Sequence, residues 1–82
     1  MSGHSEMEAQ VQELLLRILN LPAPSAGGAL VRADVPQWDS LKHMEIVFAL
    51  EDRYGVQFDE SEFQRLDTPA AIAAAVRRHL AP

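Results

Sequence analysis

Residues 39–55 read DSLKHMEIVFALEDRYG, and this stretch predicts a helix that begins near Ser40 and ends at Tyr54. Asp39 is a good N-cap candidate, because a short side chain that accepts hydrogen bonds is favoured at that position. Gly55 suits the left-handed residue that follows many helices. The sequence therefore predicts both ends of this helix.

The predicted helix carries more apolar surface than a small bundle needs. On a helical wheel its apolar residues span an arc of about 220°, whereas a packed surface helix needs little more than about 100°. One half of the arc, a natural core face, consists of Ile46, Val47, Leu50 and Tyr54. The other half consists of Leu41, Met44 and Phe48. Its acidic flank consists of Glu45, Glu51 and Asp52.

A second apolar half with an acidic flank predicts a surface that docks onto basic partners. The alternative is that the loop before the helix covers this half, with Trp38 as its lid. Both interpretations are open at the level of the sequence.

Three further helices are predicted around this one. Their expected ranges are Glu6 to Leu19, Asp59 to about Leu66, and Thr68 to about His79. The first and last show apolar residues at helical spacing, which in the last are Ile72, Val76 and Leu80. A long connection from Leu21 to Asp39 begins with a flexible Pro-Ala-Pro-Ser-Ala-Gly-Gly linker. The expected fold is all-α: a four-helix bundle with a long loop between helices 1 and 2 and a short third helix.

Length, charge and composition narrow the classes of function. A chain of 82 residues is enough for one domain, and we expect a disordered N-terminus at 1–5 and a single domain at 6–82. A net charge of −5 disfavours nucleic acid and fits a partner with a positive patch. The chain has no cysteine, so thiolate metal sites are excluded, and we expect no metal. No apolar run approaches the length of a membrane span, so we expect a cytoplasmic location. We also expect a monomer.

Ser40 is the polar residue whose position most suggests a functional site, although many serines at a helix start are ordinary first-turn residues. A phosphate on Ser40 is favoured there, because the helix N-terminus offers unpaired N–H groups and the positive end of the dipole. His43 lies three residues further on, but no G-x-S-x-G motif surrounds Ser40, which argues against a serine hydrolase. His43 falls on the core side of the wheel, and we expect a partly buried packing residue.

The segment WDSLKHMEI at 38–46 resembles the phosphopantetheine attachment motif of acyl and peptidyl carrier proteins. The following ALEDRYGV at 49–56, the short third helix and Thr68-Pro69 are also similar to that family. The resemblance covers Glu6 to Leu80 and implies an acyl-carrier-like bundle that is not an enzyme. It also implies a 4'-phosphopantetheine arm on Ser40, with Asp39 beside it, and partner docking through Leu41, Met44, Glu45, Phe48 and Asp52.

The implied partners are a phosphopantetheinyl transferase and acyl-loading and acyl-processing enzymes with basic docking patches. Three residues depart from the fatty-acid-synthesis pattern, namely Trp38, Lys42 and Arg53. These departures favour a carrier of acyl thioesters in a specialised fatty-acid, polyketide or related pathway. The alternatives are a peptidyl (aminoacyl) carrier of nonribosomal peptide synthesis and a helical interaction module with no covalent arm.

Overall fold

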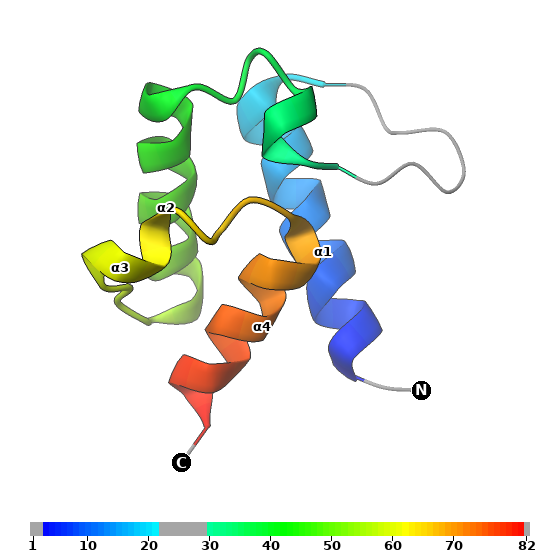
Figure 1. Ribbon diagram of the computed structural model, residues 1–82. Coiled ribbons are helices and arrows are strands. Elements are labelled where there is room, and N and C mark those ends of the chain that lie inside the picture. The colour runs from blue at the N-terminus through cyan, green and yellow to red at the C-terminus, as the bar shows by residue number, and fades with distance from the viewer. Residues whose placement is uncertain (1–2, 22–29, 82) are drawn as a thin grey trace.

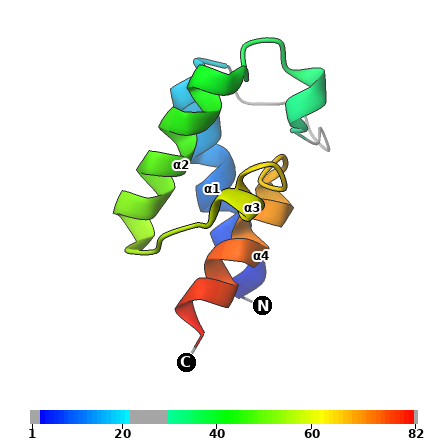
Figure 2. The ribbon, with the colours of Figure 1, turned by 60° about the vertical axis from the view of Figure 1, so that its left-hand side comes forward.

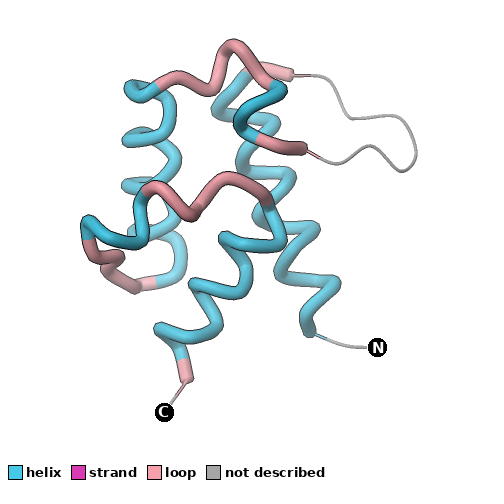
Figure 3. The backbone as a smooth tube through the Cα atoms, viewed as in Figure 1, coloured by secondary structure: helices cyan, strands magenta, loops and turns pink. Residues whose placement is uncertain are grey.

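The computed structural model describes residues 3–21 and 30–81. This part of the chain forms four α-helices and one short 3-10 helix: α1 (Gly3–Leu19), η1 (Arg32–Asp34), α2 (Ser40–Tyr54), α3 (Glu60–Phe63) and α4 (Pro69–Leu80). Within the same two ranges no strand occurs (Figure 3). The expected all-α fold, with a long connection before the second helix and a short third helix, is confirmed.

The three long helices make up most of the molecule. α1 and α2 run in opposite directions, and α4 packs against α1 and runs in the same general direction as α2 (Figures 1 and 2). The short α3 lies between α2 and α4 along the chain. The described chain begins and ends at the same end of the bundle, whereas α2 starts at the opposite end.

Apolar side chains from all three long helices form one core. Its largest fully buried members are Val11, Leu15, Ile46, Val47, Leu50, Leu66, Ile72 and Val76. Each such side chain stabilises the fold by about 1.5–3 kcal/mol through burial. The predicted core face of α2 is confirmed, because its three aliphatic members are buried and Tyr54 packs against the core at its edge.

Local interactions set three helix ends where the sequence predicts them. Asp39 caps α2, since its Oδ1 accepts from the Lys42 N–H at 2.9 Å. Gly55 ends α2 with a φ of 66°, in the left-handed region that favours glycine. Thr68 caps α4, since its Oγ1 accepts from the Ala71 N–H at 3.0 Å. These ends need no long-range contact, which explains why the sequence could predict them.

Two helix boundaries differ from the expected ones. α1 begins at Gly3 rather than at Glu6, so part of the segment 1–5 that was expected to be disordered is helical. α3 ends at Phe63 rather than near Leu66. The backbone tightens after α3, because the Arg65 N–H donates to the Glu62 carbonyl at 2.9 Å, and this turn directs Leu66 into the core.

The end of α4 also differs from the expectation. The helix continues to Leu80, one residue past the predicted end, and Leu80 is 51% exposed although it continues the apolar face of Ile72 and Val76. The last turn of α4 diverges from α1 in both ribbon views (Figures 1 and 2). Helical periodicity aligned these three side chains correctly, but it could not show that the end of α4 diverges from its neighbour.

The second half of the α1–α2 connection lies on the core. Leu30 and Trp38 are buried there, and the Arg32 N–H donates to the Asp67 carbonyl at 2.9 Å. This bond fastens η1 to the loop before α4. The predicted Pro-Ala-Pro-Ser-Ala-Gly-Gly linker lies outside the described residues.

None of the described helices combines the length and apolar character that crossing a membrane requires. The cytoplasmic location and the division of the chain at residues 5 and 6 stay predictions.

The fold predicts opposite outcomes for two substitutions in α4. Ile72→Ala should lower the free energy of unfolding by about 2–5 kcal/mol, because it removes a fully buried side chain and leaves a cavity. Leu80→Ala, in the same helix but half-exposed, should change it by about 0.5 kcal/mol or less. Urea unfolding followed by circular dichroism measures both, and equal losses would contradict the core described above.

Candidate functional site

Ser40 is the first residue of α2, and its side chain is exposed. The N-cap Asp39 beside it is also exposed. Only the Lys42 N–H of the first turn is bonded by a capping side chain, so the other N–H groups there remain available to an incoming anion. The positive end of the α2 dipole lies at the same place, so a negative group on the Ser40 hydroxyl is stabilised electrostatically.

Trp38 lies in the core beneath the start of α2 and does not cover the apolar half of that helix. It is 3% exposed, and its indole Nε1–H donates to His43 Nδ1 at 2.9 Å. The interpretation of Trp38 as a lid over Leu41, Met44 and Phe48 is therefore wrong. A buried indole N–H needs an acceptor, and His43 is the acceptor that draws Trp38 inward.

His43 is buried and held from both sides of its ring, so its expected packing role is confirmed. Nδ1 accepts from Trp38, and the opposite atom, Nε2, lies 2.6 Å from the Phe63 carbonyl oxygen. This arrangement requires the neutral tautomer with its proton on Nε2. Burial lowers the pKa of His43 below its ordinary value of 6.5 and outweighs the hydrogen bond to Phe63, which raises it. The nearby Arg32 charge lowers the pKa further.

The same hydrogen bonds prevent His43 from activating Ser40. A general base needs a free nitrogen within reach of the hydroxyl proton, and both ring nitrogens are already engaged with Trp38 and Phe63. Among the described residues no hydrogen bond joins Ser40 to His43. The geometry provides an accessible hydroxyl without a catalytic partner.

Leu41, Met44 and Phe48 form an uncovered row along α2, which we call the α2 apolar strip. Their side chains are 69%, 38% and 57% exposed. Exposed large apolar residues that lie together on one helix face are typical of interaction sites. The core packs against the other face of α2, so the division of its apolar arc into two halves is as the sequence predicts.

The acids near the strip have different roles. Glu45 and Asp52 are exposed, and Glu45 pairs with Lys42 at 3.4 Å. Both partners of that pair are well exposed, so solvent and salt screen it. Glu51 was expected on the same flank, but its Oε2 accepts from the Phe58 N–H at 2.9 Å. It supports the turn after α2, so the acidic flank consists of Glu45 and Asp52.

A hollow of about 200 Å³ lies directly beside Ser40. It is lined by Arg32, Ser40, His43, Met44, Phe63 and Gln64. These residues come from η1, α2 and the end of α3, so only the folded chain brings them together. Sequence reasoning missed Arg32, which lies eight positions before Ser40 in η1, too short an element to show a periodic signal.

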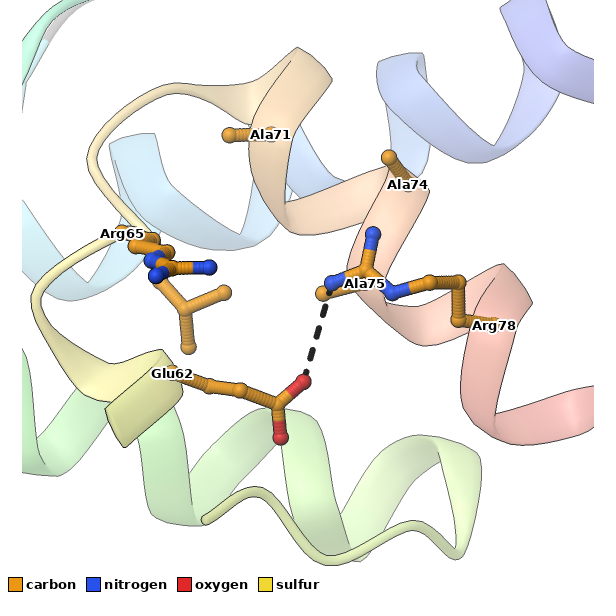
Figure 4. Close-up of a pocket in the computed structure, with 7 residues that line it drawn as sticks. Glu62, Arg65, Ala71, Ala74, Ala75 and Arg78 are labelled. Atoms are coloured by element: carbon orange, nitrogen blue, oxygen red, sulfur yellow. Dashed lines mark ion pairs between the residues drawn. The ribbon is translucent and has the colours of Figure 1, made fainter. Parts of the chain in front are cut away.

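A second hollow, of about 340 Å³, lies between α3 and α4 and does not include Ser40. Figure 4 shows Ala71, Ala74 and Ala75 along its wall and the ion pair of Glu62 with Arg78 across it, at 3.7 Å. Glu62 also accepts from the Asp59 N–H, and that bond is the main reason why its pKa is lowered. The small alanines of α4 therefore leave room on this side. In the described ranges no group of three or more His, Asp or Glu side chains could hold a metal ion.

The buried His43 predicts a loss of stability in mild acid. Its folded pKa is lowered, so the unfolded state binds the proton more readily and the unfolding free energy falls once the pH drops below about 6.5. Stability is fully present above that pH. Denaturation with urea between about pH 7.5 and about pH 5.5 should show this decline in the wild type and a smaller one in His43→Gln.

His79→Gln is the matched control, because His79 is exposed, pairs with Glu62 and takes no part in the hydrogen bonds that hold His43. It should keep the wild-type decline. If the free energy of unfolding of His43→Gln declines with acidification as much as that of the wild type, another titratable group causes the decline.

The family comparison bears on the same part of the chain. A sequence model described as "Phosphopantetheine attachment site" matches residues 38–76, from Trp38 before α2 to Val76 in α4. Domains of this family are non-catalytic; they carry 4'-phosphopantetheine covalently on a serine and serve a transferase and processing enzymes as partners. An exposed serine beside an open hollow fits such an arm. Residues 38–76 of the chain thus match the family of phosphopantetheine-binding carrier domains.

Proposed function

We propose that Ser40 is the serine that carries the phosphopantetheine arm. The matched region contains two serines, Ser40 and Ser61. Both serines are exposed, but Ser40 opens the fifteen-residue α2 and borders the hollow of about 200 Å³, whereas Ser61 lies within the four-residue α3. The observation that carries the proposal is this exposed hydroxyl at the start of a long helix, next to a space that an arm can enter.

The chain's own contribution to the chemistry is limited to presenting that hydroxyl. Attachment forms a bond from Ser40 Oγ to phosphorus and breaks the pyrophosphate bond of coenzyme A, which releases adenosine 3',5'-bisphosphate. The hydroxyl proton passes to the transferase, because His43 is fully engaged. The chain has no cysteine, so the thiol that holds the cargo as a thioester is supplied by the arm.

The cargo that we propose is an acyl group from a specialised fatty-acid, polyketide or related pathway. Support comes from α2, where Lys42 and Arg53 replace acids that are frequent in carriers of fatty-acid synthesis. Both lie on the solvent side of the helix, where a partner meets them. An aminoacyl or peptidyl cargo is the alternative. The helical interaction module without an arm is disfavoured by the family match.

The α2 apolar strip, together with Glu45 and Asp52, is the docking surface that we propose for partner enzymes. Three exposed apolar side chains supply contact area, and the two acids attract a basic patch and orient it. The strip begins at Leu41, immediately after Ser40, so a partner bound to it lies close to the base of the arm. A surface of this size supports brief encounters, which suits a carrier that moves between enzymes.

Modification at Ser40 is tested by intact mass. The wild-type protein, incubated with coenzyme A and a phosphopantetheinyl transferase, should gain the mass of one arm. Ser61→Ala should gain it too, whereas Ser40→Ala should remain unmodified. A modified Ser40→Ala, with the arm mapped to another residue, would refute the assignment.

The same measurement on protein isolated from its natural cells reports the cargo. An acyl mass on the arm would support the proposed pathway class. An aminoacyl or peptidyl mass would favour the alternative and leave the attachment site unaffected.

Electrostatic docking is tested by reversing one charge on α2. Glu45→Lys should slow modification by the transferase several-fold at low salt and much less at high salt, because salt screens exposed charges. Glu13→Lys makes the same change in net charge on the exposed side of α1 and should have little effect. The measurement is kcat/KM against salt concentration, and equal effects of the two variants would show that only net charge matters.

A further inference from the structure

Arg32 lines the same hollow as Ser40, and neither helix periodicity nor the attachment motif identifies it. Both residues line the space of about 200 Å³. Arg32 is half-buried and Ser40 is exposed, so the hollow connects a partly buried cationic residue with an accessible hydroxyl. A group bonded to Ser40 Oγ and directed into this space therefore approaches a cation.

Two hydrogen bonds hold Arg32 in place. Its backbone N–H donates to the Asp67 carbonyl at 2.9 Å, and its side-chain Nε–H donates to the Trp38 carbonyl at 3.2 Å. Trp38 precedes Ser40 by two residues, so their Cα atoms are at most about 7 Å apart. The guanidinium is thus anchored next to the backbone that leads into α2.

Among the residues that the structure describes, no hydrogen bond or ion pair engages the terminal nitrogens of Arg32. Nε uses one of the five N–H donors of the guanidinium, and the other four belong to the two terminal nitrogens. Within the ranges 3–21 and 30–81 no carboxylate pairs with Arg32 at 4.0 Å or less. A half-buried cation with free donors is suited to a phosphate oxygen, for which arginine has a matching planar geometry.

The local charges also favour this pairing. Asp39 precedes Ser40 and carries a negative charge, so a phosphodiester on Ser40 adds a second negative charge close to the first. The first turn of α2 offers only its dipole and the Lys42 side chain, and Lys42 is paired with Glu45. Arg32 is the cation that shares a cavity with Ser40.

We propose that Arg32 binds the phosphodiester of the arm on Ser40 and holds the first atoms of the arm over the hollow formed by η1, α2 and α3. This inference rests on the proposed attachment at Ser40 and adds a positioning residue to it. Attachment then also links η1 to α2 through the phosphate. Modified protein should therefore have a more stable loop than unmodified protein.

The experiment compares the apo and holo forms of four proteins: wild type, Arg32→Gln, Arg32→Lys and Arg65→Gln. Arg65 is exposed and lines the other hollow, so Arg65→Gln removes the same charge away from Ser40. Thermal melting measures each holo-minus-apo difference, which cancels any effect of the substitution on the apo protein. The ³¹P chemical shift of each holo protein, folded and in urea, reports on the phosphodiester directly.

Wild type and Arg65→Gln should melt about 2–6 °C higher in the holo form than in the apo form. Arg32→Gln should lose this gain, and Arg32→Lys should keep part of it. The wild-type gain should shrink at high salt. The ³¹P shift should change on unfolding in the wild type and much less in Arg32→Gln.

Two results separate this inference from the proposed function. Wild-type protein that accepts the arm on Ser40 but melts at the same temperature in both forms, with a ³¹P shift indifferent to Arg32→Gln, would overturn the role of Arg32 alone. Wild-type protein that accepts no arm at Ser40 would overturn the attachment site and this inference with it.

Discussion

A buried chain of hydrogen bonds runs from the Trp38 indole through the His43 ring to the Phe63 carbonyl, at 2.9 Å and 2.6 Å. The indole can only donate and the carbonyl can only accept, so a neutral histidine with its proton on Nε2 satisfies both. In the described part of the chain every buried side-chain polar atom has a partner. These two hydrogen bonds connect the loop before α2, α2 itself and the end of α3. They thereby fix the position of the α2 start, where Ser40 lies.

This constraint lets one helix serve two purposes. The core face of α2 is held by aliphatic packing and by His43, so the opposite face does not have to contribute to folding. Leu41 and Phe48 can remain exposed there at little cost to stability. A chain of 82 residues buries only a modest core, so its stability depends strongly on the packing of the core face of α2. The acidic residues Glu45 and Asp52 border the α2 apolar strip, so charged groups adjoin its exposed apolar surface.

Residues with the same charge have different roles in this structure, because their side chains contact different neighbours. Glu51 and Glu45 lie six positions apart on α2, yet Glu51 accepts from the Phe58 N–H and Glu45 faces solvent. Arg32 and Arg53 differ in the same way, since Arg32 is anchored to Trp38 beside Ser40 and Arg53 lies over the Tyr54 ring at 5.8 Å. Their contributions follow from these contacts and not from the charge that they share.

The sequence alone determined the features that depend on near neighbours. Asp39 as a cap, Gly55 as a stop and the two apolar halves of α2 follow from interactions within about one helical turn, and Ser40 stands out through the motif around it. Tertiary structure alone decided that Trp38 turns inward and that Arg32 reaches the hollow beside Ser40. It also decided that Leu80 stays exposed. Each of these depends on a partner, or on the course of a neighbouring helix, that only the folded chain brings into place. No local propensity encodes such a contact.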